Sequence, residues 1–163
     1  PSTAINPVTG QLYVVWEDAR FSGGSYNEIA MSTSRDGGTT WSAPTRVSTP
    51  TGRLAFTPAV AVDALGHVGV SYFDLRALLP GNTSTIPTQY WLTTLQADGI
   101  TTLATTQITD QPFDLGGAPQ SNGLFLGDYQ GLVAAGSQFQ AFYARPTGLI
   151  QNPTDIFSAK LAG

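Results

Sequence analysis

The sequence predicts an all-β fold: a partial β-propeller of about three four-stranded antiparallel blades. The first observation behind this prediction is a turn motif at residues 34–41, which lies between two strand-like runs. The second is a unit that recurs three times, each copy made of a glycine turn, a strand and an aromatic-rich end that closes on arginine. Units of this kind at intervals of about 50 to 70 residues, with no convincing helix between them, are typical of propeller blades.

The turn motif has the spacing S-x-D-x-G-x-x-W, with Ser34, Asp36, Gly38 and Trp41 at its fixed positions. An aspartate in a turn accepts hydrogen bonds from its own loop backbone. Glycine allows the positive φ that a tight turn requires. Trp41 supplies a large apolar ring that can fold back over the loop. We therefore predict a self-contained structural turn, in which Asp36 is not catalytic.

The three copies of the repeated unit cover residues 6–20, 63–76 and, more loosely, 135–145. Their strands are rich in the β-branched and aromatic residues that favour pleated sheets. Further strands complete the units, and we take residues 1–163 as one domain with blades at approximately 1–50, 51–110 and 111–163. The strands outside the first copy are expected at residues 28–33, 43–48, 57–62, 68–73, 89–95, 103–108, 129–134, 139–144 and 155–161. A compact β-sandwich built from the same strands is the alternative.

The motif at 34–41 resembles the bacterial neuraminidase repeat, or Asp-box, of sialidases and many other β-propellers. Six blades are usual in the sialidase-like family, so the resemblance implies that this chain corresponds to the three C-terminal blades. It also implies open blade faces, covered by the remaining propeller half or by a second copy of the chain.

Composition restricts the class of partner. The net charge is −4 and there is no basic run, which argues against nucleic acid. No stretch approaches the apolar length that crosses a membrane. The chain has no cysteine and one histidine, so we expect no metal and no cofactor. Only 11% of the residues are charged, which suits a secreted protein in an extracellular or periplasmic location.

The sialidase resemblance also implies a site. Sialidases bind the substrate carboxylate with three arginines and use a tyrosine nucleophile polarised by a glutamate. Tyr129 opens the innermost strand of the last unit, where that nucleophile is expected, so it is the catalytic candidate. The substrate-binding candidates are Arg53, Asp128, Arg76 and Arg145.

Plainer interpretations stay open for these residues. Arg20, Arg76 and Arg145 recur at one blade position, which favours a shared structural role such as pairing with Asp18 or Asp74. Tyr129 can also be a packed residue at the start of a strand, and Arg53 a solvated loop residue.

The sequence leaves the rest of the catalytic set undefined. Glu17 and Glu28 are the only glutamates, and neither is well placed by sequence to polarise Tyr129. Asp110, Asp114 and Asp128 are close in sequence and offer oxygen ligands that suit calcium, as an alternative to a site without metal.

The predicted function is that of a fragment of a secreted sialidase-like glycoside hydrolase, acting on or recognising glycans. Alone it should be inactive, because it lacks an identifiable general acid. The alternative is a non-catalytic propeller that binds glycans or proteins through exposed aromatics such as Phe21, Tyr26, Phe113 and Phe125. A third option is a scaffold without a ligand.

Overall fold

A computed structural model describes the backbone of residues 1–162 and the side chains of residues 1–161. This part of the chain consists of β-strands and two short 3-10 turns, η1 (Ala19–Ser22) and η2 (Leu115–Gly117). The strands are β1 (Ser2–Ile5), β2 (Leu12–Asp18), β3 (Glu28–Ser34), β4 (Thr45–Arg46), β5 (Ala55–Val62), β6 (Val68–Asp74), β7 (Pro87–Leu95), β8 (Thr102–Gln107), β9 (Phe113–Asp114), β10 (Gly131–Ala135), β11 (Gln138–Leu149) and β12 (Asn152–Ala162).

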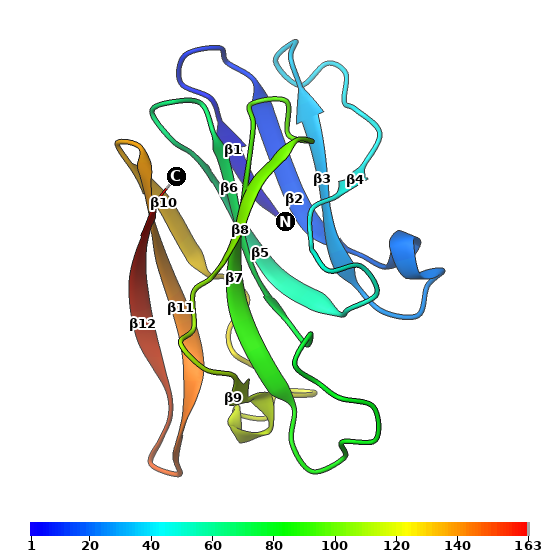
Figure 1. Cartoon of the computed structure of the whole chain (residues 1–163), viewed down its shortest axis with the longest axis vertical. Helices are drawn as coiled ribbons and strands as arrows, with labels where there is room; N and C mark the ends of the chain where they lie inside the picture. Colours follow the sequence, from blue (N-terminus) through cyan, green and yellow to red (C-terminus); the bar gives the residue numbers. More distant parts are fainter. Residues whose placement is uncertain (163) are drawn as a thin grey trace.

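These strands form three antiparallel sheets that follow the order of the chain (Figure 1). The first blade has the order β1-β2-β3-β4, the second β5-β6-β7-β8 and the third β10-β11-β12. Pairing therefore stays within each predicted unit, except that β9 pairs with β7. The fold is a partial β-propeller, as predicted, and the β-sandwich alternative is wrong.

Several boundaries differ from the sequence prediction; β11, for example, runs to Leu149 and β12 begins at Asn152, beyond the ranges expected for them. The strand expected at 43–48 is reduced to β4, because Ser42 instead bonds to β3 through its own side chain and carbonyl. The pairing of β9 with β7 places residues 113–114 on the second sheet, although the third unit was predicted to begin at 111. Finally, β10 begins at Gly131, so Tyr129 lies just before the strand that it was expected to open.

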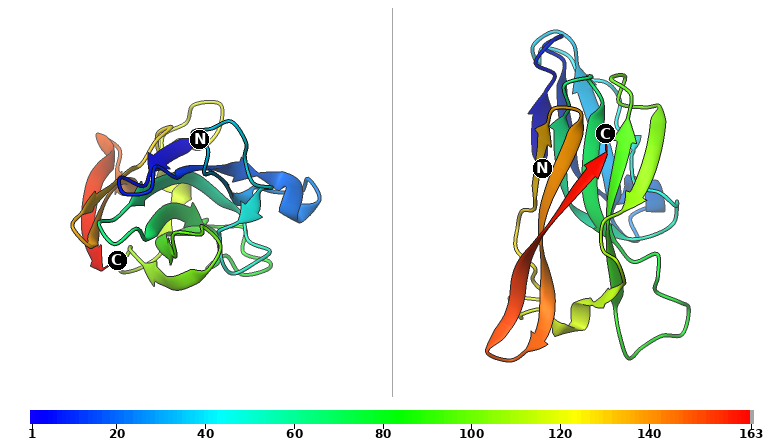
Figure 2. Two further views of the ribbon diagram at one scale, coloured as in Figure 1. Left: turned by 90° about the horizontal axis from the view of Figure 1, so that it is seen from above. Right: turned by 60° about the vertical axis from the view of Figure 1, so that its left-hand side comes forward.

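The first strands of the blades lie next to one another. Strand β5 lies against β1 and against β10, and the Val60 amide donates a hydrogen bond to Ser2 Oγ at 3.2 Å. The sheet of the second blade lies between the other two (Figure 2). This is the arrangement of neighbouring blades around a propeller axis.

Two apolar layers join the blades. The first junction, between the first and second blades, includes Tyr13, Val15, Ile29, Met31, Val60, Val68, Val70, Tyr72 and Leu95. The second junction, between the second and third blades, includes Ala61, Phe73, Tyr90, Leu92, Phe139, Ala141, Tyr143 and Leu161. Each blade thus buries one sheet face against the next.

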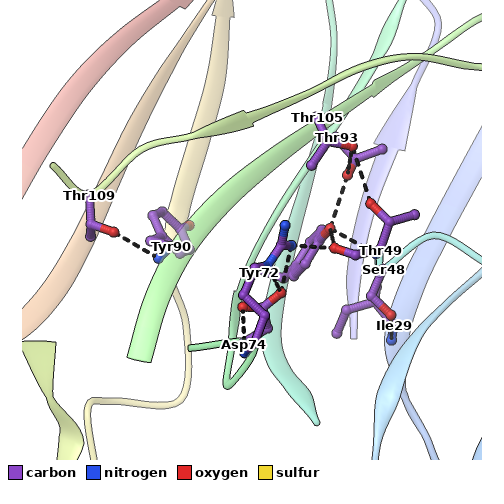
Figure 3. Close-up of polar contacts among 10 residues, drawn as sticks. Ile29, Ser48, Thr49, Tyr72, Asp74, Tyr90, Thr93, Thr105 and Thr109 are labelled. Carbon is purple, nitrogen blue, oxygen red and sulfur yellow. Dashed lines mark hydrogen bonds and ion pairs between the residues drawn. The ribbon is translucent and has the colours of Figure 1, made fainter. Parts of the chain in front are cut away.

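A repeated hydroxyl contact fixes the chain after the fourth strand. In the first blade the Ile29 amide donates to Ser48 Oγ at 3.1 Å. In the second blade the Tyr90 amide donates to Thr109 Oγ1 at 3.2 Å (Figure 3). The hydroxyl therefore satisfies a buried backbone donor beyond the end of the outer strand.

Candidate functional site

The turn at Ser34–Trp41 is self-contained, as predicted. Asp36 Oδ1 accepts hydrogen bonds from Ser34 Oγ at 2.8 Å and from the Thr40 amide at 2.9 Å. The Thr40 hydroxyl bonds to the other carboxylate oxygen, and these contacts lower the pKa of Asp36 to about 2. Trp41 folds back so that its Nε1 donates to the Gly38 carbonyl at 3.1 Å. Both carboxylate oxygens of Asp36 accept hydrogen bonds from within the turn, in agreement with a structural role.

The second blade keeps the centre of this turn without its tryptophan. Asp98 Oδ1 accepts from the amides of Ile100 and Thr101, both at 2.8 Å. The Thr101 hydroxyl donates to Asp98 Oδ2 at 2.6 Å, as Thr40 does to Asp36. A reduced form of the turn is thus present in the second blade.

A pocket lies at the opposite ends of the blades from the Ser34–Trp41 turn. It has a volume of about 570 Å³, within the range typical of small-ligand sites. It opens where β2 ends, where β5 begins and where the chain approaches β10. Its lining consists of Pro1, Val14, Trp16, Glu17, Thr57, Pro58, Asp128 and Tyr129.

Glu17 is held in this pocket by two hydrogen-bond donors. Its Oε1 accepts from the Thr57 amide at 2.9 Å, and its Oε2 accepts from Asn27 Nδ2 at 3.0 Å. Thr57 has a φ of 45°, a left-handed conformation that is costly for a β-branched residue. It lies where the β5–β6 register shifts between Phe56 and Ala59. The irregular strand start thus aims a backbone amide at the carboxylate.

The Trp16 ring is oriented by a second acidic residue. Its Nε1 donates to Asp18 Oδ2 at 2.7 Å, and Arg20 Nε donates to the same oxygen at 2.7 Å. The Arg20 hydrogen bond lowers the pKa of Asp18 to about 2, so this carboxylate is ionised at neutral pH. Trp16 is therefore a fixed aromatic wall of the pocket.

Tyr129 and Asp128 reach the pocket from the segment before β10. Tyr129 is 81% exposed, and Asp128 is also exposed. The structure places Glu17 in the same lining as Tyr129. The two residues share this lining because the end of β2 and the approach to β10 converge at the start of β5.

A smaller hollow of about 260 Å³ adjoins this pocket and shares Glu17, Thr57 and Asp128 with it. Its other lining residues are Phe56, Leu115, Leu124, Phe125, Leu126 and Gly127. The two hollows form a continuous surface on either side of Glu17.

The arginines named from the sequence lie outside both linings. Arg76 bonds to the buried Asp74, with Nε to Oδ2 at 2.7 Å, and its guanidinium stacks 3.4 Å from the Trp91 ring centroid. Arg145 lies 3.5 Å from Asp110 and stacks on Phe157.

These contacts confirm the predicted structural pairing of Arg20 and Arg76 with the aspartates of their own blades. Arg53 is exposed and donates to the Gly52 carbonyl. Substrate binding by Arg53, Arg76 or Arg145 stays a prediction.

The three aspartates considered for calcium do not come together. Asp110 pairs with Arg145, Asp114 accepts from the Ile86 and Gly116 amides, and Asp128 lines the pocket. Among the described residues no three acidic, histidine or cysteine side chains are grouped to hold a metal ion. Over the same residues, no helix has the length and apolar character needed to span a bilayer.

Comparisons with known proteins identify the architecture. Neither a protein-family model nor a curated protein matches the chain. Among solved structures, it is similar to the Hadza microbial sialidase Hz136, with a TM-score of 0.56 and 20% sequence identity. The fold is sialidase-like. The match covers 88% of this chain and 31% of the sialidase chain, so this chain spans about a third of that protein's length.

Proposed function

We propose that this chain supplies part of the active site of a sialidase-like glycoside hydrolase, which acts on or recognises glycans. The observation that carries the proposal is the joint placement of Glu17 and Tyr129 in one pocket of sugar-accommodating size. The fold similarity to a microbial sialidase supports it, as does the resemblance of the Ser34–Trp41 turn to the Asp-box. A secreted location is part of the same proposal.

Tyr129 would act as the nucleophile and Glu17 as its base. A phenol is a weak nucleophile until a neighbouring base takes its proton. Glu17 suits this role because the Thr57 amide and Asn27 fix the orientation of its carboxylate, while each oxygen keeps a further lone pair. In the reaction, the proton of Tyr129 passes to Glu17 as the phenolic oxygen bonds to the anomeric carbon. The glycosidic oxygen leaves with a proton from a general acid. No residue of the described part of the chain is assigned to that role.

Covalent trapping tests the proposal without that acid. A glycosyl fluoride loses fluoride without protonation, so a competent Tyr129 should form an aryl glycoside without the acid. Its phenolic oxygen bonds to the anomeric carbon, fluoride leaves, and Glu17 takes the phenolic proton. We expect incubation with a panel of uncharged and sialyl fluorides to add one sugar to the tryptic peptide that contains Tyr129. Substitution Tyr129→Phe should abolish the adduct, and Glu17→Gln should slow its formation by about 10² to 10⁴.

Tyr26→Phe is the matched control, because Tyr26 does not line the pocket, and it should react like the parent. An adduct at unrelated residues, or one that persists in Tyr129→Phe, would reject Tyr129 as the nucleophile.

A non-catalytic glycan- or protein-binding module is the second candidate. It is favoured by the exposure of two aromatic side chains beside these hollows, Tyr129 at 81% and Phe125 at 39%. In this case glycan binding would survive Tyr129→Phe and weaken in Phe125→Ala, with no adduct in the trapping experiment.

A further inference from the structure

We infer that the pocket takes an uncharged sugar ring stacked on Trp16, and disfavours an anionic sugar such as a sialic acid. This inference rests on the proposed glycan-directed function and names the class of its ligand. It departs from the substrate suggested by the name of the structural neighbour.

The side chains that line the pocket include acidic residues. Glu17 and Asp128 place two exposed carboxylates in the lining. Asp18 lies behind Trp16, but its charge is balanced by Arg20 at 2.7 Å. The lining side chains that the structure describes thus carry two negative charges and no positive one, and the amine of Pro1 is the single positive group of the lining, so a negative charge on the sugar meets a net repulsion.

No arginine of the described chain lines the pocket. Recognition of a sugar carboxylate needs guanidinium groups that are free to form paired hydrogen bonds with it. In this chain Arg20, Arg76 and Arg145 are engaged by Asp18, Asp74 and Asp110. Arg76 and Arg145 also stack on aromatic rings that lie outside the pocket lining. Arg20 comes near the pocket, with its Cζ 5.9 Å from the centroid of the Trp16 ring, but its Nε donates to Asp18. Arg53 is exposed and lies outside the lining, so no arginine within residues 1–162 lines the pocket to pair with a sugar carboxylate.

One wall of the pocket is aromatic. Trp16 presents an aromatic surface whose orientation is fixed by its hydrogen bond to Asp18. Sites for uncharged polar ligands combine such apolar surfaces with a few oriented polar groups. Glu17 and Asp128 fit this pattern because carboxylates accept strong hydrogen bonds from hydroxyl groups. An uncharged sugar supplies these donors and carries no charge that the carboxylates would repel.

The test compares two ligands that differ by one sialic acid, lactose and sialyllactose, in titrations with the 163-residue chain. We expect sialyllactose to bind roughly tenfold more weakly than lactose at low salt. High salt should narrow the difference because the repulsion is screened. The double substitution Glu17→Gln with Asp128→Asn should also reduce the difference in affinity between the two ligands, chiefly by improving the binding of sialyllactose. Trp16→Ala should weaken the binding of both ligands.

A matched control is Asp114→Asn, which removes an acidic side chain outside the lining and should leave the ratio unchanged. Equal or tighter binding of sialyllactose by the unmodified chain would overturn the inference and leave the glycan-directed function standing. If neither ligand nor any other glycan of a broad panel binds, the proposed function itself fails.

Discussion

The two junctions between the blades solve the same packing problem in different ways. The first junction is mainly aliphatic at its centre, and a polar network lies at the link between its two blades, where the Thr49 amide donates to Tyr72 Oη at 3.2 Å (Figure 3). The second junction is largely aromatic, with the ring centroids of Phe73 and Tyr90 4.4 Å apart and those of Tyr90 and Tyr143 4.8 Å apart. Blades with the same strand order thus do not require the same kind of interface.

One position of the repeat shows how the difference arises. Tyr13 of the first blade and Gly69 of the second occupy equivalent places, three residues after the turn glycines Gly10 and Gly66. Tyr13 fills the first junction itself, and its hydroxyl donates to the Ala97 carbonyl at 2.7 Å. At Gly69 the side chain is missing, and Phe139 of the third blade occupies the space. A ring of the earlier blade thus fills the first junction, whereas a ring of the later blade fills the second.

Phe139→Ala should have the largest effect, because it removes the ring that fills the second junction. We expect a loss of about 3 to 5 kcal/mol in the free energy of unfolding, measured by urea denaturation. Phe142→Ala is the control, since Phe142 lies on the same strand with 43% exposure and should cost about 1 kcal/mol or less. Hydrogen exchange should show that β11 loses protection before β2. Equal loss in both strands would mean that the junctions open as one unit.

Arg76→Ala should break the polar end of the first junction. Arg76 joins the buried Asp74 to the Thr49 carbonyl, so its removal leaves a buried carboxylate unpaired at a cost of about 3 kcal/mol. Arg20→Ala removes the equivalent residue from an exposed rim and should shift the unfolding midpoint far less.

The effect of Arg76→Ala should also depend on pH. Burial raises the pKa of Asp74 above its ordinary value, so the folded state favours the protonated acid, and its contribution to stability falls as the pH rises through that pKa. Loss of the arginine should raise this pKa further. The stability gap between variant and parent should therefore shrink as the pH is lowered toward 4, and a gap that widens would contradict the assignment.

Gly69→Ala tests whether the second junction depends on the missing side chain. A Cβ at this position would lie 2.7 Å from Phe139 Cε1, so we expect overpacking to cost about 1 to 3 kcal/mol. Combining the change with Phe139→Leu should give a smaller loss than the sum of the two single changes. Strict additivity would show that the ring and the glycine are not in contact.

Asp36→Asn should have the smallest effect and probes a turn outside both junctions. The Thr40 hydroxyl is the main cause of the low pKa of Asp36, about 2 in the folded protein. Its contribution to stability is therefore complete above the ordinary aspartate pKa and lost as the pH falls toward 2. The parent should lose more stability than the variant between pH 5 and pH 2.5, as measured by thermal unfolding. An identical loss in both proteins would rule out this carboxylate as a source of acid sensitivity.

The sequence was sufficient for features that depend on local chemistry. The Ser34–Trp41 turn, the pairing of Arg20 and Arg76 with their aspartates and the order of the strands were all predicted correctly. In each case the interacting groups are close along the chain or repeat at a fixed spacing. The hydroxyl contacts of Ser48 and Thr109 were missed, although both follow an aliphatic residue at the end of a unit and could have been found by aligning the repeats.

The pocket could be predicted only in part. Tyr129 and Asp128 were named from the sequence, but Glu17 shares their pocket through packing between blades that no local pattern records. The bend at Thr57 was also invisible, because threonine is a residue that disfavours positive φ. The contacts of the arginines were also predicted only in part. The sequence shows that these arginines repeat at one blade position, but it does not show the aromatic rings on which Arg76 and Arg145 stack.

The conformation of Thr57 has a consequence for how the chain can evolve. A left-handed threonine costs about 1 to 2 kcal/mol, an appreciable part of the 5 to 15 kcal/mol that holds a typical domain together. Glycine would relieve that cost with a single replacement, so selection for robustness alone should favour it. A threonine retained here would mark a position where a rigid amide donor matters more to the organism than a thermally tougher fold.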